Sequence, residues 1–264
     1  MIPRDKYNVK RLSIPIDEPF AYFTINYRHY KHRICPSQGG QVKAVSAVAN
    51  SAPVWILAKS NVDFSGPASL KGKRIAVGLA PGTSNTLLLR LLQQNHLDPK
   101  KDVKIQEVQN GSELGPVLAG QADVAVAYEP QVDQGVGQGL KVIYDFTKDY
   151  PQYAFSTINT SEKLIQDNPD LVRRFVGSIN ESLAFIRLHP DIAKQVARKE
   201  FGSLDGKLVD AAVQRMIDSN VYPANTRISP EALATAINIQ KFVGNITGDM
   251  PYEKVVDPQF AAQQ

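Results

Sequence analysis

The run Gly82-Thr83-Ser84-Asn85 has the residue types of an anion-binding loop. It follows the apolar segment 75–77, which predicts a buried strand, and it precedes leucines that recur at helical spacing over 87–92. Backbone N–H groups at a helix start lack partners, and the helix dipole favours negative charge there. We therefore expect Thr83 or Ser84 to cap the helix and the loop to bind a sulfonate, phosphate, carboxylate or nitrate. A plain N-cap without a ligand is the alternative.

Tyr128 and Glu129 follow another apolar segment, 123–127, which also predicts a buried strand. Open α/β sheets bind ligands at the C-terminal ends of their strands, so both residues are candidate ligand contacts. For Glu129 the alternative is a loop carboxylate that caps a neighbouring backbone. For Asp123, at the start of the strand, we expect only local hydrogen bonding. A ligand's short apolar tail would pack on Trp55 and Tyr128, although a core position is the preferred interpretation of Trp55.

Motifs for catalysis or metal binding are missing from the sequence. It has no G-x-S-x-G, H-E-x-x-H or P-loop motif. The run 135–139 resembles part of a dinucleotide fingerprint. In the Rossmann geometry the glycines follow a strand and precede a helix, whereas here they are expected to follow a helix and precede a strand. Cys35 is the single cysteine, and the neighbours of His29, His32 and Cys35 are cationic. We therefore expect no catalytic residues, no metal and no cofactor.

The positive charge of this 264-residue chain is concentrated near its start. Residues 1–43 hold eight basic and three acidic side chains, and the other 221 residues hold 22 and 23. A nucleic-acid-binding surface is not expected to be confined in this way. No stretch approaches the roughly 18 apolar residues of a membrane span. No apolar core of a signal peptide follows Met1. Residues 1–40 are interpreted as an atypical basic head.

From residue 41 onward, short apolar strands alternate with helical segments, which predicts an α/β fold with parallel βαβ units. Beyond residue 161 the pattern is mostly helical. Ser161 and Ser229 precede two of these helices as predicted N-caps, and the last helix is expected to end near Ile246.

The order of several segments resembles periplasmic substrate-binding proteins of ABC importers, in the nitrate/sulfonate/taurine-type family. The resemblance covers roughly residues 41–250. It is carried by Asn50–Lys59, by Leu70–Val77 with Gly82-Thr83-Ser84, and by Leu118–Val126 followed by Glu129-Pro130. It implies a two-lobed periplasmic-binding-protein-like (type II) fold with a ligand between the lobes. Lobe I would comprise 41–61 and 148–264, and lobe II would comprise 62–147.

The resemblance also implies crossovers near Ile56–Ser60 and Tyr144–Phe155. Lobe closure would trap the ligand between the 82–85 loop, Asn50 and Ser51. Family members open with an export signal and a βαβα unit. We expect that unit to be missing from this sequence or replaced by the basic head, and lobe I to be incomplete. The implied protein is a periplasmic, monomeric, non-enzymatic binding protein. Its partners would be a small anionic ligand, an alkyl or aryl sulfonate first and nitrate or taurine second, and the importer's membrane permease.

Two other functions share this fold. The enzymatic alternative is a thiamine-pyrimidine synthase, and a precursor-binding protein of the same fold goes with it. A resemblance to the synthases would imply a cysteine-rich motif and an essential histidine, whereas Cys35 is the single cysteine of this sequence. A regulatory effector domain is the second alternative, and its usual helix-turn-helix partner is absent from the first 60 residues.

Overall fold

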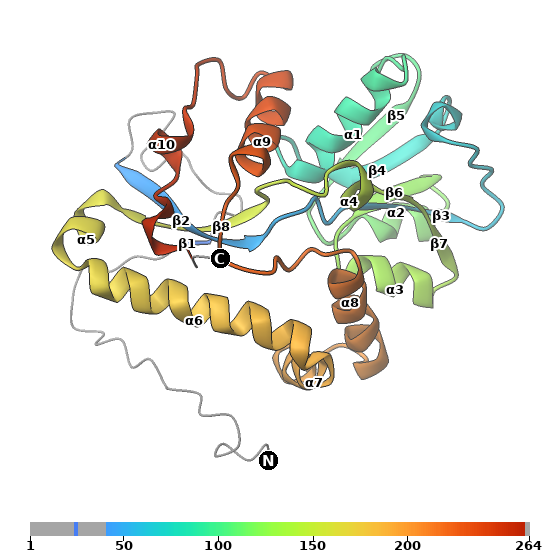
Figure 1. Cartoon of the computed structure of the whole chain (residues 1–264). Helices are drawn as coiled ribbons and strands as arrows, with labels where there is room; N and C mark the ends of the chain where they lie inside the picture. The colour runs from blue at the N-terminus through green and yellow to red at the C-terminus, as the bar shows by residue number, and fades with distance from the viewer. Residues whose placement is uncertain (1–23, 26–40, 262–264) are drawn as a thin grey trace.

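The computed structural model describes residues 24–25 and 41–261, so most of the basic head, with Cys35, lies outside the described residues. The strands are β1 (Thr24–Ile25), β2 (Val42–Ala49), β3 (Trp55–Lys59), β4 (Arg74–Gly78), β5 (Lys104–Val108), β6 (Val124–Ala127), β7 (Leu140–Asp145) and β8 (Ser156–Ser161). The α-helices are α1 (Thr83–Gln94), α2 (Leu114–Leu118), α3 (Gln131–Gly137), α4 (Phe146–Asp149), α5 (Glu162–Asp167), α6 (Pro169–Leu188), α7 (Pro190–Glu200), α8 (Gly206–Asp218), α9 (Pro230–Phe242) and α10 (Tyr252–Val255). Two sheets lie side by side with these helices packed around them (Figure 1).

The larger sheet has the strand order β5-β4-β6-β3-β7. β4 runs parallel to β5 and β6, as the βαβ pattern predicts, whereas β3 runs antiparallel to both β6 and β7. The leucines of α1 pack on one face of this sheet, against Ile56, Ile75 and Val77. α2 and α3 cover the other face, where Trp55 and Leu57 are buried. A sheet with helices on both faces requires strands that are apolar throughout, which is the pattern of β3, β4 and β6.

The position of β3 corrects the predicted crossover at Ile56–Ser60. β3 lies inside the larger sheet, paired on both edges, and the side chains of Ile56, Leu57 and Ala58 are fully buried. Residues 55–59, predicted as part of lobe I, therefore belong to the larger sheet. The first connection between the sheets is residues 50–54. The second, residues 146–155, falls within the predicted Tyr144–Phe155.

The smaller sheet has the order β1-β8-β2, with antiparallel pairs throughout. α5 and α6 pack on one of its faces around Val45 and Ile158. α9 and α10 lie over the other face, around Ala44 and Ala47 (Figure 1). Ser161 and Ser229 cap α5 and α9 as predicted. α9 ends at Phe242 rather than near Ile246, because Gly244 adopts φ 77°, a backbone conformation that ends helices.

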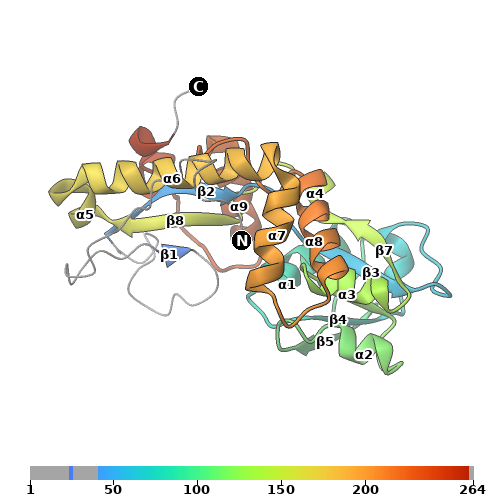
Figure 2. The same cartoon turned by 90° about the horizontal axis from the view of Figure 1, so that it is seen from below.

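The two sheets are also joined by helices from the C-terminal half of the chain. α8 follows α6 and α7 in sequence, yet it packs against α3 of the larger sheet (Figure 2). Val221, just after α8, is fully buried in the same core as Trp55. The C-terminal helices therefore contact both sheets.

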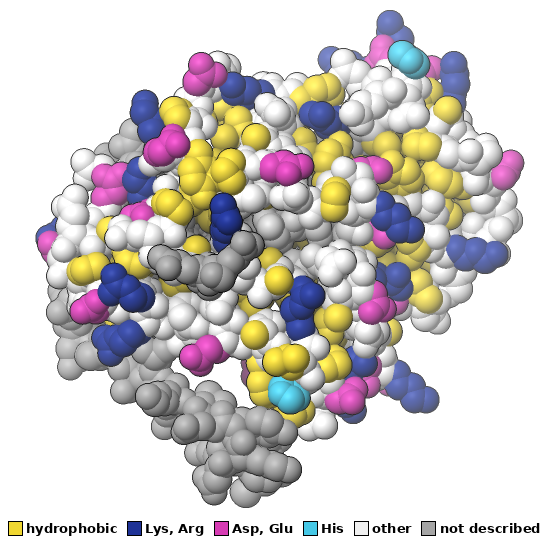
Figure 3. Space-filling view, viewed as in Figure 1, with side chains coloured by type: hydrophobic (Ala, Val, Ile, Leu, Met, Phe, Trp, Pro, Cys, Tyr) yellow, Lys and Arg dark blue, Asp and Glu magenta, His cyan; other side chains and the backbone are white. Residues whose placement is uncertain are grey.

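The visible surface mixes charges of both signs. On the face drawn in Figure 3, Lys and Arg side chains alternate with Asp and Glu, and no broad basic area forms among the described residues. None of the described helices is both long enough and apolar enough to cross a membrane.

Gly135, the first glycine of the 135–139 run, is a packing residue. A Cβ placed there would lie 2.8 Å from Leu57 Cδ2 and 3.0 Å from Leu114 Cδ2, whereas one at Gly137 would meet nothing within 4 Å. The missing side chain lets α3 approach β3 closely. Gly135 therefore serves the packing of α3 on the sheet.

Gly135→Ala is expected to destabilise the protein by about 1–3 kcal/mol, because two buried leucines must shift to admit one methyl group. Gly137→Ala on the same helix is the matched control. It is expected to be neutral or slightly stabilising, since alanine favours helix. Urea unfolding measures both changes. Equal stability of the two variants would contradict the close packing of α3 on β3.

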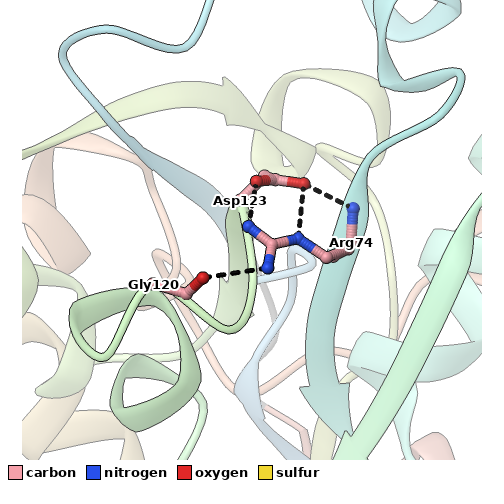
Figure 4. Close-up of polar contacts among 3 residues, drawn as sticks. All are labelled: Arg74, Gly120 and Asp123. Carbon is pink, nitrogen blue, oxygen red and sulfur yellow. Dashed lines mark hydrogen bonds and ion pairs between the residues drawn. The ribbon is translucent and has the colours of Figure 1, made fainter.

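Arg74 and Asp123 tie the starts of β4 and β6 together (Figure 4). Arg74 Nη2 donates to Asp123 Oδ1 at 2.7 Å, and its Nε and backbone N donate to Oδ2 at 3.2 and 2.8 Å. Nη1 donates to the Gly120 carbonyl at 2.9 Å. The structure confirms the local hydrogen-bonding role predicted for Asp123. Since these are the N-terminal ends of parallel strands, the pair lies at the edge of the sheet opposite the α1 start.

Asp123→Asn is expected to lower the free energy of unfolding at pH 7 by about 1–2 kcal/mol, because it removes charge-assisted hydrogen bonds. Hydrogen bonds from the Arg74 side chain hold the pKa of Asp123 below its usual value. The stabilisation is therefore present above the unfolded-state pKa of about 3.9 and is lost as the pH falls through the lower folded-state pKa. Urea unfolding at pH 7 and pH 3 tests this. Asp167→Asn, in an exposed pair with Lys163, is the control and should cost under about 0.5 kcal/mol.

Candidate ligand-binding site

The predicted loop joins β4 to α1 as expected. β4 ends at Gly78 and α1 begins at Thr83. The N-cap is Gly82, with an extended backbone and no side-chain cap bond, so the prediction that Thr83 or Ser84 caps the helix is wrong. Both residues already have helical backbone, and the Thr83 side chain is hydrogen-bonded to Tyr153 instead. The helix start therefore depends on backbone groups and on side chains from other elements.

Tyr128 reaches the start of α1 from the end of β6. Its hydroxyl oxygen accepts a hydrogen bond from the backbone N–H of Ser84 at 2.8 Å. This contact brings the segment after β6 against the start of α1. It also satisfies one of the unpaired N–H groups at the helix start with a neutral, displaceable oxygen.

Asn85 and Glu107 fix the loop from the other side. The Asn85 side-chain amide donates to the Gly78 carbonyl at 3.1 Å and to Glu107 Oε1 at 3.2 Å. Glu107, on β5, also accepts from the backbone N–H of Ala80 at 3.1 Å. Asn85 thus positions the loop, and its predicted contact with a ligand stays a prediction.

Three aromatic rings run from the α1 start toward the connection between the sheets. The ring centroids of Tyr128 and Phe155 are 6.0 Å apart, and those of Phe155 and Tyr153 are 6.3 Å apart. Tyr153 is hydrogen-bonded to Thr83 on α1 and to Gln240 on α9, and burial raises the pKa of its phenol to about 12. Tyr153 therefore stays neutral and links α1 to α9 through one side chain.

Asn50 and Ser51 begin the first connection between the sheets. The Asn50 carbonyl accepts from the backbone N–H of Tyr153 at 2.9 Å, and its own N–H donates to the Val221 carbonyl at 3.1 Å. Because Tyr153 also bonds Thr83, the structure places Asn50 and Thr83 around one common residue.

Three buried side-chain oxygens on these two segments lack hydrogen-bond partners within residues 24–25 and 41–261. They are Asn50 Oδ1, Ser51 Oγ and Ser84 Oγ. Ser51 and Ser84 are 1% and 0% exposed. A buried polar atom without a partner costs about 1–3 kcal/mol, so native proteins keep few of them. These three oxygens are therefore candidates for contact with a ligand.

Glu129 has partners within the protein. Arg215 Nε on α8 lies 2.6 Å from Glu129 Oε1, and the backbone N–H of Asp133 donates to Oε2 at 3.1 Å. Burial first, and then the charge of Asp133, raises the pKa of Glu129 to about 7. The predicted contact of Glu129 with a ligand stays a prediction, and its observed role is to join β6 to α8.

No sequence pattern marks Tyr153, Phe155, Glu107 or Arg215 as part of this site. Tyr153 and Phe155 lie in the irregular segment between β7 and β8, where no periodicity marks them. Arg215 lies in an ordinary amphipathic helix. Only the spacing of aromatic residues in the second connection, Tyr150, Tyr153 and Phe155, would have drawn attention to that segment.

This arrangement is the fold of periplasmic binding proteins. The structure matches the periplasmic aliphatic sulphonate-binding protein SsuA from Escherichia coli with a TM-score of 0.68, at 18% identity, over 86% of this chain and 72% of that chain. It also matches the desulfurization enzyme DSZB with a TM-score of 0.63, at 16% identity, over 84% of this chain and 78% of that chain. At these identities the likeness shows the fold, which binding proteins and an enzyme share.

The chain belongs to the family described as NMT1/THI5 like, whose model matches residues 23–193. A relative in sequence is the riboflavin-binding protein RibY of Chloroflexus aurantiacus, 31% identical over 189 residues, which is 70% of this chain and 52% of RibY. The chain thus spans about half the length of this curated relative.

Proposed function

We propose that this protein is the substrate-binding component of an ABC importer and that it binds a small organic compound between the two sheets, at the start of α1. The observation that carries the proposal is the set of buried, unpartnered oxygens of Asn50, Ser51 and Ser84. They lie on the connection between the sheets and on α1, which Tyr153 joins. A site of this kind binds a ligand without converting it, because its described residues include no nucleophile with an adjacent base.

The proposal extends to the mode of action. Residues 55–145 form one lobe, and the described residues before 50 and after 155 form the other. The lobes close about the connections 50–54 and 146–155. The ligand contacts are Asn50, Ser51, Gly82, Thr83, Ser84 and Tyr128, with Asn85 and Glu129 behind them. The protein acts as a periplasmic monomer and delivers its ligand to a membrane permease, without a cofactor or nucleic acid.

Two features narrow the class of ligand. The N–H groups at the start of α1 favour an oxygen-rich or anionic group. The rings of Tyr128 and Phe155, together with the riboflavin-binding relative, favour a planar ring system. We therefore propose a ring-bearing compound with polar oxygen substituents. Aryl sulfonates and flavins meet both requirements, whereas alkyl sulfonates, nitrate and taurine lack the ring.

Turnover of a bound compound is the competing function. It is raised by the fold shared with a desulfurization enzyme and by the thiamine-pyrimidine synthase alternative. The two histidines among the described residues argue against it. His96 follows the end of α1, and His189 lies between α6 and α7 against the ring of Phe185. Both stand at helix ends away from the α1 start, so neither serves this site as a base.

Isothermal titration calorimetry with the purified chain tests the proposal. The panel contains an aryl sulfonate, an alkyl sulfonate, taurine, nitrate, riboflavin and a thiamine-precursor pyrimidine. Each compound is also incubated with the protein and analysed for products. We expect saturable one-to-one binding of a ring-bearing compound without turnover. Binding of nitrate alone would contradict the ring requirement, and reproducible turnover would replace the binding-protein proposal by an enzymatic one.

A further inference from the structure

A charged cluster joins the two halves of the molecule beside the proposed site. Glu129 lies at the end of β6, Asp133 in the first turn of α3, and Arg215 on α8. Arg215 Nε is 2.6 Å from Glu129 Oε1, and Arg215 Nη2 donates to Asp133 Oδ1 at 2.6 Å. Both carboxyl side chains are 6% exposed and the arginine side chain is 27% exposed. One cation on α8 thus contacts two buried carboxyl groups, one from the turn after β6 and one from α3.

The charge of this cluster does not balance when both carboxyl groups are ionised. Two carboxylates and one guanidinium leave a net charge of −1 in a buried position, where an uncompensated charge is costly. One proton makes the cluster neutral. Burial and the neighbouring Asp133 raise the pKa of Glu129 to about 7, so that proton exchanges near neutral pH.

The other acidic groups on β7 and α8 have partners of their own. Asp210 of α8 pairs with Arg198 at 3.0 Å, and Asp218 accepts from Gln214. Asp145 of β7 accepts from Thr147 at the start of α4. The remaining charged side chains on β3, β7 and α8 are Lys59, Lys141 and Lys207. Among the described groups, the charges that act on Glu129 are those of Asp133 and Arg215.

The cluster is connected to the proposed site on both sides. Glu129 follows Tyr128, whose hydroxyl accepts from the Ser84 N–H. α8 leads to Val221, whose carbonyl accepts from the Asn50 N–H. A groove of about 470 Å³ between α3 and α8 has Asp133 in its wall, which gives solvent protons a path to the cluster. A movement of α8 away from α3 would break the ion pairs and shift both sides of the site.

We propose that Arg215 is a positioning residue in a proton-dependent latch: protonation of Glu129 favours the state in which α8 is closed against β6 and α3, and loss of that proton favours opening. The consequence for ligand affinity rests on the proposed function; the latch itself does not. Because the Glu129 pKa is raised on folding, its stabilising contribution is fully present below the unfolded-state pKa, about 4.3, and is lost as the pH rises through about 7.

The first experiment uses ligand-free protein and compares wild type, Glu129→Gln and Glu231→Gln. Glu129→Gln keeps the shape of the side chain and removes its titration. Glu231 accepts from Gln152 at 2.9 Å outside the cluster and is the matched control. In urea unfolding between pH 5.5 and 8.5, the wild-type unfolding constant is expected to rise with pH by at least about tenfold. Glu231→Gln should keep this dependence, and Glu129→Gln should lose most of it. An unchanged dependence in Glu129→Gln would overturn the latch.

The second experiment separates a moving latch from a static ion pair. Small-angle scattering of ligand-free wild type is expected to show a larger radius of gyration at pH 8.5 than at pH 6, with no such change in Glu129→Gln. Arg215→Lys keeps the charge but loses the two-point contact, so it should be expanded at both values of pH. Equal radii for wild type at the two values of pH would overturn the proposal.

Calorimetry with riboflavin and with an aryl sulfonate at pH 6 and pH 8.5 then tests the link to binding. Either probe that binds should bind wild type more tightly at pH 6, and this ratio should approach one in Glu129→Gln. Binding that is independent of pH in wild type would overturn the link. If neither probe binds at either pH, the proposed ligand class fails, whereas the two ligand-free experiments still decide the latch.

Discussion

Replacing Ser51 and Ser84 together by alanine is expected to weaken ligand binding by about one to two decades while making the ligand-free protein more stable. Both hydroxyl groups are buried and have no hydrogen-bond partner within the described residues. In the ligand-free protein they therefore contribute only a desolvation cost of about 1–3 kcal/mol each, which alanine removes. In the complex they would bind the ligand, and two lost hydrogen bonds correspond to about 10- to 100-fold in affinity.

Urea unfolding and calorimetry on the same preparations measure the two opposite effects. Ser84 is helical, so part of any gain in stability comes from the higher helix propensity of alanine. Ser182→Ala, an exposed helical serine that donates to the Ser178 carbonyl, measures that part. A double variant less stable than wild type would show that the hydroxyl groups are satisfied without a ligand. Unchanged affinity would place the ligand elsewhere.

Trp55→Ala is expected to destabilise the protein by about 3–5 kcal/mol, the usual cost of a large cavity in a core. Trp55 is 1% exposed and packs with Leu57, Ala125 and Val132 between the larger sheet and the helices α2 and α3. This burial confirms its core interpretation and excludes it as a surface for a ligand's apolar tail. The loss is a large part of the roughly 5–15 kcal/mol of a typical domain, so the unfolding midpoint should fall by about 10 °C.

Thermal and urea unfolding of Trp55→Ala and Trp55→Phe check this prediction. Phenylalanine fills most of the volume and should recover more than half of the loss. At a temperature where Trp55→Ala remains folded, its ligand affinity should lie within a few-fold of the wild-type value. A selective loss of binding in Trp55→Phe, at wild-type stability, would return Trp55 to the site.

Much of the local structure was predictable, because the signals that determine it are close together in the chain. The strand, loop and helix over 75–92 follow from an apolar run, a glycine and leucines at helical spacing. Ser161 and Ser229 cap their helices because an N-cap depends on the next three residues. The position of the candidate loop at a strand end was predicted for the same reason.

Tertiary structure alone decided where β3 pairs, what caps α1 and which partner Glu129 has. The run 55–59 is apolar in either lobe, so its pattern does not say whether it crosses between the sheets or enters one. Gly82 takes the N-cap position of α1, and the Thr83 side chain has Tyr153, from a segment without periodicity, as its partner. Arg215 and Asp133 are 82 residues apart. Such contacts form only when packing of the helices brings distant segments together, because a side chain's partner across the fold is not encoded in its neighbours along the chain.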